Sequence, residues 1–320
     1  VRDKHYKYYK IALFEKSPKN INDKTWSFWE EGNGKWDQLI SKQWKSAKIY
    51  AQNEEVNLKL APYTYKMLRS IDFYNFAYTE LHKANNIQIF FEEVKHIQEN
   101  ENSVNIQTTD AKYEADLVFN SQLPDFKKLQ REAKFTLLQH FKGWFIETDQ
   151  AVFNADEFIM MDYRFKDKDL TSFMYVLPTD QNKALIEFTY FTPNLVNKAH
   201  YDSFLEKYIR QHLQVTNFKI IEQEHGIIPM SNYQFTKNNT DKMIQIGTAG
   251  GWVKASSGYS FKNAEKKAEQ ITINLKQNLP PTHRLFKAKY KHYDSLFLNV
   301  LYNHNYVGEK VFYKLYAKNN

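Results

Sequence analysis

A glycine-rich stretch, Met243 to Phe261 (MIQIGTAGGWVKASSGYSF), most constrains how this chain can fold. A short apolar segment, Met243 to Ile246, leads into a turn that holds three of the chain's nine glycines. Glycine keeps side chains away from the backbone amides of such a turn, so a phosphate or a ring can approach closely. The next segment, Lys262 to Asn278, has the apolar spacing of a helix. The pattern predicts a strand, a cofactor-binding loop and a helix, and a purely structural turn is about equally compatible with it.

Composition excludes several classes of protein. At 320 residues the chain can form two lobes that share a ligand or one large α/β domain, and 42% hydrophobic residues exclude wholesale disorder. No apolar run reaches the roughly 18 residues of a membrane-spanning helix, and the first ten residues, VRDKHYKYYK, are too charged for a secretory signal. Without cysteine there are no disulfides and no thiol catalysis, so a reducing compartment is expected. The net charge of +7 is dispersed, which favours a solvated basic surface over a nucleic-acid site.

The first part of the chain has the element order of a nucleotide-binding lobe. Lys10 to Glu15 (KIALFE) is typical of a buried strand ending in an acid. In dinucleotide-binding folds such an acid binds ribose about 20 residues after a G-x-G-x-x-G turn. No glycine precedes Glu15, so either the N-terminal unit lies outside this sequence or the first pyrophosphate loop has been lost. Glu15 as an ordinary strand-end carboxylate is the alternative. The elements expected next are a helix around Ser70 to Ala84, a strand at Ile87 to Phe91, an antiparallel meander between Val94 and Tyr113, and a strand at Ala115 to Asn120.

Four consecutive strands without a helix between them predict an antiparallel sheet, one face of which is an apolar floor of Phe, Tyr and Met. These strands are Phe135 to Thr148, Phe158 to Phe165, Ser172 to Pro178 and Lys183 to Phe191. A helix at Asp202 to His212, a strand at Val215 to Glu224, a turn at His225 to Met230 and two C-terminal helices, Tyr293 to Leu301 and Gly308 to Ala317, complete the expected elements.

Glu187 is the candidate acid. It lies in KALIEFTYF between apolar and aromatic neighbours, and such surroundings raise a carboxyl pKa and allow proton donation near pH 7. By spacing alone, a strand glutamate that faces solvent is the more common arrangement. Asp162 and Arg164 alternate on one strand and could form an ion pair. His140 could be a base or a hydrogen-bonded core residue, and no second ligand at metal spacing accompanies it.

Several of these strings resemble the lycopene cyclase family, flavoproteins that close the end rings of carotenoids. IGTAGGWVKASSGYSF resembles the family's second FAD-contacting motif, and Asn22 to Glu30 (NDKTWSFWE) resembles the string after its ribose acid. LLQHFKGWFIET, MDYR, FMYVLP, LIE and GIIPM follow in family order. Phe188 occupies the position where many cyclases have a second acid, which would leave Glu187 to act alone.

The resemblance implies an α/β fold with a Rossmann-like FAD-binding lobe of the glutathione-reductase and p-hydroxybenzoate-hydroxylase type. An antiparallel β-sheet substrate lobe would be inserted into it, and a helical cap would follow. The expected ranges are 1–130 for the first, N-terminally incomplete part of the FAD lobe, 131–230 for the substrate lobe, 231–279 for the return segment of the FAD lobe and 280–320 for the C-terminal helices.

The resemblance also implies a function, that of a lycopene β-cyclase. Such an enzyme closes lycopene end groups into β-ionone rings by acid-initiated carbocation chemistry, with reduced FAD, NAD(P)H as reductant and no net redox change. Glu187 would be the catalytic acid. The expected FAD-binding residues are Glu15, Gly247, Thr248, Ala249, Gly250, Gly251, Ser257 and Gly258. The expected substrate-pocket residues are Trp26, Trp29, His140, Trp144, Asp162, Arg164, Tyr175 and Tyr190.

A long apolar substrate implies a cytoplasmic protein in peripheral contact with the inner face of the membrane, with no nucleic-acid partner. Two alternatives stay open at this point: a flavin-dependent oxidoreductase or hydroxylase on the same fold, and an inactive truncated homologue.

Overall fold

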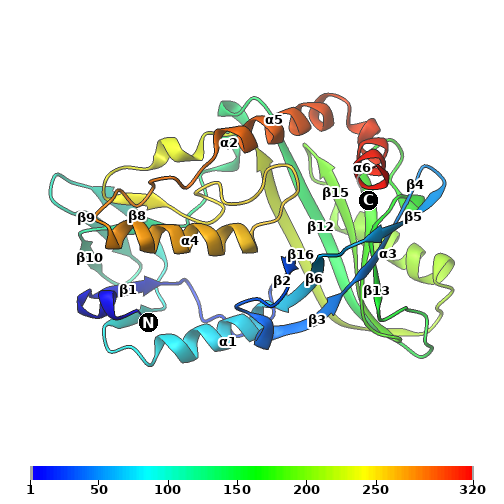
Figure 1. The fold of residues 1–320 in the computed structure, drawn as a ribbon, viewed down its shortest axis with the longest axis horizontal. Helices are drawn as coiled ribbons and strands as arrows, with labels where there is room; N and C mark the ends of the chain where they lie inside the picture. The colour runs from blue at the N-terminus through cyan, green and yellow to red at the C-terminus, as the bar shows by residue number, and fades with distance from the viewer. Residues whose placement is uncertain (1–2, 319–320) are drawn as a thin grey trace.

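A computed structural model describes residues 3–318, and its largest element is a seven-stranded sheet (Figure 1). The strand order is β16-β12-β15-β14-β13-β4-β5, and neighbouring strands are antiparallel except β13 and β4. The bounds are β4 Ser46–Ala51, β5 Glu54–Lys59, β12 Thr136–Thr148, β13 Glu157–Asp162, β14 Ser172–Asp180, β15 Lys183–Thr192 and β16 Phe218–Ser231. The predicted antiparallel sheet is confirmed, and β4 and β5, which come from the range expected for the FAD lobe, extend it.

The two faces of this sheet carry separate cores, because successive side chains of a strand point to opposite faces. One face, here the α3 face, packs against α3 (Lys198–Lys207) and the π-helical turn Tyr208–His212 that follows it. The other, here the β2 face, meets β2 (Thr25–Glu31), β6 (Tyr63–Arg69), α5 (Ala288–Asn303) and α6 (Gly308–Ala317).

The predicted turn at His225 to Met230 was wrong. These residues continue β16, which runs without interruption from Phe218 to Ser231. Pro229 is compatible with this strand because β16 is an edge strand of the sheet, where a residue without an N–H group removes no bond to a second neighbour.

The nucleotide-binding lobe holds two short parallel sheets. β1 (Ile11–Phe14) pairs with β7 (Ile87–Phe90), and β11 (Val118–Asn120) pairs with β17 (Met243–Gln245). In Figure 1, α1 (Ser70–Leu81) and α4 (Phe261–Lys276) lie on either side of β1. The predicted meander is confirmed as β8 (Val94–Glu99), β9 (Val104–Thr108) and β10 (Lys112–Ala115).

A three-stranded sheet, β2-β6-β3, stands between the nucleotide-binding lobe and the large sheet, with β3 at Ile40–Trp44 (Figure 1). The remaining α-helix is α2 (Phe126–Glu132). Among residues 3–318, no helix combines the length and the apolar character needed to cross a membrane.

Candidate active site

A pair of carboxyl groups lies on the β2 face of the large sheet. Glu187 of β15 and Glu224 of β16 both stand opposite Gly143 of β12, the strand between them. A Cβ atom on Gly143 would lie 2.8 Å from Cγ of Glu187 and 3.2 Å from Cγ of Glu224. The two glutamates therefore lean toward each other across the space that the glycine leaves open.

Burial and pairing keep the proton on Glu187. Its side chain is only 8% exposed, and burial raises its pKa well above the ordinary value for glutamate. A hydrogen bond to Glu224 and the repulsion between the two carboxyl groups raise this pKa further. The hydroxyl of Thr25 on β2 also donates to Oε2 of Glu224, at 2.7 Å. Burial and the neighbouring Glu224 carboxyl thus both favour the protonated form of Glu187.

Three tyrosines connect this acid to the glycine-rich loop. Tyr175 of β14 stands directly opposite Glu187, and its hydroxyl is 2.7 Å from that of Tyr65 on β6. The Tyr65 hydroxyl is in turn 3.0 Å from that of Tyr259, which follows Gly258 in the loop. Burial raises the pKa of all three phenols well above the ordinary value, so they remain neutral hydrogen-bonding groups.

Aromatic rings pack around these tyrosines. The Tyr65 ring stacks on Phe158 with ring centroids 4.5 Å apart, and Trp29 lies 4.5 Å from Tyr65 on another side. Phe158 also contacts the edge of Tyr175. The faces of aromatic rings carry negative charge density, so such surroundings favour a cation.

The glycine-rich loop connects β17 to α4, as the sequence predicts. Gly247, Gly251 and Gly258 have φ values of +58°, +68° and +73°, which side-chain-bearing residues rarely adopt. A Cβ atom on Gly250 would lie 2.3 Å from the carbonyl oxygen of Gln245, so this turn closes tightly on its own strand.

Two observations on this loop fit a bound cofactor. Nothing lies within 4 Å of the position where Gly247 would carry a Cβ atom, so the backbone is open to close approach there. The hydroxyl of Ser257 is buried without a hydrogen-bond partner among the described residues, and so is Oε1 of Gln139, which packs against Gly258. Buried polar atoms normally have partners, so a ligand that supplies them would complete the loop.

Glu15, the expected ribose acid, lies at the end of the β1-β7 sheet, away from the strand that leads into the glycine-rich loop. It follows β1, accepts a hydrogen bond from the backbone N–H of Lys16 and lies 3.3 Å from the ammonium of Lys19. About a third of its side chain, 34%, is exposed, so the carboxylate is accessible to a ligand. Among residues 3–318, no hydrogen bond or ion pair joins Glu15 to the glycine-rich loop, and its role in FAD binding stays a prediction.

The expected substrate-pocket residues lie on both faces of the large sheet. Trp29 and Tyr175 lie on the β2 face near Glu187, and Trp26 packs against Phe73 and Phe261 beside them. The α3 face instead carries or adjoins His140, Trp144, Tyr190, Asp162 and Arg164. The structure thus brings only part of the set together, and the substrate-binding role of each residue stays a prediction.

The residues near the α3 face have structural partners. Arg164 binds both carboxylate oxygens of Asp162, at 2.8 and 2.6 Å, which confirms the predicted ion pair. His140 stacks on Tyr190, and its two ring nitrogens bond to the hydroxyls of Tyr201 and Thr192.

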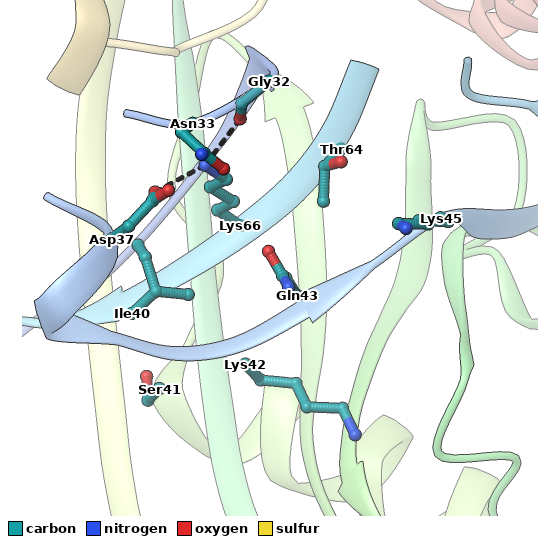
Figure 2. Close-up of a pocket in the computed structure, with 10 residues that line it drawn as sticks. All are labelled: Gly32, Asn33, Asp37, Ile40, Ser41, Lys42, Gln43, Lys45, Thr64 and Lys66. Carbon is teal, nitrogen blue, oxygen red and sulfur yellow. Dashed lines mark hydrogen bonds and ion pairs between the residues drawn. The ribbon is translucent and has the colours of Figure 1, made fainter. Parts of the chain in front are cut away.

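A polar pocket of about 570 Å³ opens at the edge of β3 and β6 (Figure 2). Three of its lining residues, Lys42, Lys45 and Lys66, carry ammonium groups, and Lys66 is the buried one. Figure 2 shows the Lys66 side chain directed at Gly32 and Asp37 instead of the open space. A smaller hollow beside Glu224 is lined by Thr25, Phe145 and Leu185, among others.

The expectation that Glu187 has no carboxylate beside it was wrong, because Glu224 supplies one from a different strand, and the catalytic role of Glu187 stays a prediction. A signal for the pair exists in the sequence: Gly143 interrupts an otherwise bulky strand, and a glycine inside a strand marks close approach by another group. The identity of that group depends on strand order, which residue spacing does not give.

Comparisons with known proteins show the family and the fold of the chain. The profile of the family described as lycopene cyclase protein matches residues 4–316. No curated protein matches the chain.

Three solved structures illustrate the fold that the chain shares. A geranylgeranyl bacteriochlorophyll reductase-like protein of Thermoplasma acidophilum has a TM-score of 0.62 at 12% identity, covering 96% of this chain and 81% of that one. A variant of HpxO from Klebsiella pneumoniae, complexed with FAD, has a TM-score of 0.56 at 12% identity, covering 95% and 84%. The tetracycline destructase Tet(55) has a TM-score of 0.55 at 11% identity, covering 96% and 85%. The predicted α/β fold with a Rossmann-like lobe and an inserted antiparallel sheet is confirmed.

Proposed function

Because the chain belongs to the lycopene cyclase family, whose profile spans residues 4–316, we propose that it is a lycopene β-cyclase. It closes the linear end groups of lycopene to β-ionone rings, giving γ-carotene and then β-carotene, without net oxidation or reduction. The observation that carries this proposal is a buried carboxyl, Glu187, which lies beside a second carboxyl on a face lined with aromatic rings, where burial raises its pKa.

The reaction begins with proton transfer from Glu187 to the terminal double bond of the polyene. The carbocation that forms is attacked by a neighbouring double bond of the same end group, which closes the ring. Loss of one proton from the ring then leaves the neutral product, so the atoms of substrate and product are the same. The faces of Trp29, Tyr65 and Phe158 stabilise the cation and exclude water that would otherwise capture it.

The glycine-rich loop is the FAD-binding element of this proposal. Gly247 to Gly251 would approach the cofactor with the backbone, Ser257 and Gln139 would supply the polar atoms that lack protein partners, and Glu15 would bind ribose. Reduced FAD, when bound, supplies electrostatic stabilisation of the cation, and NAD(P)H keeps it reduced. The tyrosines Tyr259, Tyr65 and Tyr175 connect this loop to the acid by hydrogen bonds and strand pairing.

Lycopene is a long apolar molecule that resides in the bilayer, so the proposal includes peripheral contact with the cytoplasmic face of a membrane. Exposed apolar side chains on α5, among them Tyr293 and Leu296, provide a surface for this contact. Lysines at 287, 289 and 291 on and before α5 would meet anionic headgroups.

The first prediction tests the acid. Purified protein supplied with FAD, NAD(P)H and lycopene in liposomes should yield cyclic carotenoids whose mass equals that of lycopene. Glu187→Gln keeps the shape of the side chain but removes the transferable proton, so ring formation should fall at least about 100-fold. Product analysis by chromatography and mass spectrometry checks this, while flavin absorbance checks that the variant still takes up FAD.

Other outcomes separate this proposal from its alternatives. Products heavier by oxygen or lighter by hydrogen would indicate an oxidoreductase or hydroxylase on the same fold, which the reductase-like structure also has. Unchanged lycopene with every cofactor present would favour an inactive homologue. Full ring formation by the Glu187→Gln protein would exclude Glu187 as the acid.

A further inference from the structure

We propose that Glu224 is a positioning residue for the acid, and that Gly143 is the opening through which the carboxyl groups of Glu187 and Glu224 meet and share one proton. The kinetic part of this inference rests on the proposed function. The pairing of the two carboxyl groups does not, and it can be measured without substrate.

The strand geometry requires the glycine. Glu187 and Glu224 lie on strands that flank β12, so their backbones are separated by two strand spacings, about 10 Å. Carboxyl groups at that separation meet only if both side chains lean over the middle strand. The distances from a Cβ atom at Gly143 to the two Cγ atoms, 2.8 and 3.2 Å, show that any larger residue there would push them apart.

A side chain of β2 orients the carboxylate of Glu224. The Thr25 hydroxyl of β2 donates to one oxygen of Glu224, so this carboxylate is oriented by a strand outside the large sheet. It is only partly buried, whereas Glu187 is 8% exposed. The better-solvated member of such a pair retains the negative charge and the more buried member retains the proton.

The other ionisable groups around the pair do not neutralise it. Tyr175 on β14, Tyr65 on β6 and Tyr259 in the glycine-rich loop are buried neutral phenols. The guanidinium of Arg69 on β6 is paired with Glu222, two residues before Glu224. Within residues 3–318, no ion pair joins a lysine, arginine or histidine to Glu187.

The pair of carboxyl groups helps Glu187 to carry a proton at pH 7, which proton donation to the polyene requires. An isolated glutamate with a pKa near 4.3 is protonated only about 0.2% of the time at pH 7, so most molecules would have no proton to give. A charged neighbour that accepts a hydrogen bond from Glu187 keeps that proton bound. After transfer to the polyene, two negative carboxylates lie together, and their repulsion favours return of the proton that the ring cation loses. One proton leaves Glu187 and one returns, so the step balances.

The test follows the carbonyl stretch of the protonated Glu187 carboxyl by infrared difference spectroscopy across pH. The band is assigned by its loss in Glu187→Gln. In Glu224→Gln the charge is removed while size and shape are kept, so the titration midpoint of Glu187 should fall by about one pH unit or more. The alkaline limb of cyclase activity should move to lower pH by the same amount, and Glu224→Asp, which restores the charge, should recover part of both shifts.

Two further variants keep the inference falsifiable. Glu222→Gln removes a carboxylate from the same strand and face, but one paired with Arg69, and should leave the Glu187 midpoint unchanged. Gly143→Ala keeps both carboxylates and separates them, so it should lower the midpoint as Glu224→Gln does. An unchanged midpoint in Glu224→Gln and Gly143→Ala, with folding verified by circular dichroism, would overturn the inference. A shifted midpoint in a wild-type protein that forms no rings would leave the pairing intact and remove the proposed function alone.

Discussion

Burial acts in opposite directions on the two kinds of ionisable group that the large sheet carries. On the β2 face it favours the proton-bearing form of Glu187, because the charged form of a carboxyl is the deprotonated one. On the α3 face it disfavours the proton-bearing form of His140, because the charged form of imidazole is the protonated one. One sheet therefore holds a neutral acid on one side and a neutral imidazole on the other.

His140 serves structure in its neutral form. The Thr192 hydroxyl donates to the carbonyl of Asn194, so it accepts from Nε2–H of His140, and Nδ1 then accepts from Tyr201. This assignment uses each ring nitrogen once, with one proton on the ring. Burial lowers the pKa of His140 to about 4, from an ordinary value near 6.5.

A pH dependence of stability follows, with the sign set by that lowered pKa. Between pH 6.5 and 4 the unfolded chain binds a proton at this histidine and the folded chain does not, so stability falls as pH falls through this window. The full effect amounts to about 3 kcal/mol. Urea unfolding at pH 7.5, 5.5 and 4.5 should show that wild type loses its advantage over His140→Gln as pH decreases. An equal difference between the two proteins at all three pH values would contradict a neutral buried His140.

At this scale the sequence predicts single residues better than pairs. The apolar neighbours of Glu187 indicated a raised pKa. The Asp162–Arg164 ion pair is present, but not on one strand as predicted, because β13 ends at Asp162 and Arg164 lies in the 3-10 turn Tyr163–Phe165. Glu224 was not predicted because its partner is 37 residues away in the chain, and the two meet only through the order of β15, β12 and β16. For the same reason, His140, Trp144 and Tyr190 were assigned to one pocket with Trp29, because residue spacing does not tell which face of a strand packs against which core.

At the scale of elements, a cluster of charged side chains around the buried Lys66 joins the β2-β6-β3 sheet to α4. The ammonium of Lys66 on β6 is 2% exposed and lies 3.0 Å from Glu30 of β2 and 2.5 Å from Asp37. Glu30 also binds Lys262 on α4, at 2.6 Å. Burial alone would lower the pKa of Lys66, but hydrogen bonds to Asp37 and Glu30 outweigh it and raise the pKa. The cluster therefore remains charged at neutral pH and links β2, β6 and α4.

Removing the central ammonium should be costly. Lys66→Met leaves the carboxylate of Glu30, which is 9% exposed, with one cation fewer, and breaking such a buried ion pair costs about 3 kcal/mol or more. Urea unfolding of the purified variant measures this loss. Lys45→Met is the matched control, since Lys45 lines the same pocket but is exposed and should change stability by less than about 0.5 kcal/mol (Figure 2). Equal stability of the two variants would show that the cluster does not hold these elements together.

Most of the predicted elements are those with clear apolar periodicity. α1, the meander and the strands β12, β14 and β15 appear where apolar spacing placed them, whereas β13 ends at Asp162, before the predicted end at Phe165. β4 and β5 were not predicted, although buried residues alternate along β4. β6 carries no such alternation, because its residues from Tyr65 to Leu68 are all buried and both of its sides are covered. A strand buried on both faces lacks the alternation that identifies a strand from sequence.

At the scale of the whole molecule, the two faces of the large sheet are covered in different ways. The core on the α3 face is closed by helix and turn, whereas the core on the β2 face is covered by separate pieces: β2, β6, the glycine-rich loop, α5 and α6. The acid pair, the aromatic rings and the glycine-rich loop all lie under these pieces. Gln139, which packs on Gly258, is four residues from Gly143 along β12, about 14 Å at 3.4 Å per residue. A flavin-sized group and the acid could thus share one face of one sheet.

In the proposed function, the cover of the β2 face also includes the surface that would meet the bilayer. α5 inserts Leu298 and Leu301 into the core, while Tyr293, Leu296 and Val300 point outward with exposed fractions of 62%, 51% and 36%. These three recur at helical spacing, so one side of α5 is apolar and unburied. α5 also contacts β12, β15 and β16, the strands that carry Gly143, Glu187 and Glu224, so a polyene that enters at this helix would arrive beside them (Figure 1).

Binding to vesicles should therefore depend on this side of α5. The wild-type protein should sediment with vesicles that contain phosphatidylglycerol, and less so at high salt, because lysines near α5 attract anionic headgroups. Leu296→Glu places a charge where an apolar side chain would be buried, worth about 1.5 kcal/mol or more, so binding should weaken at least about tenfold. Ile273→Glu is the matched control, since Ile273 is 46% exposed on α4, away from this surface. Equal binding by both variants would place the membrane contact elsewhere, because both lose the same kind of exposed apolar side chain and only one lies on α5.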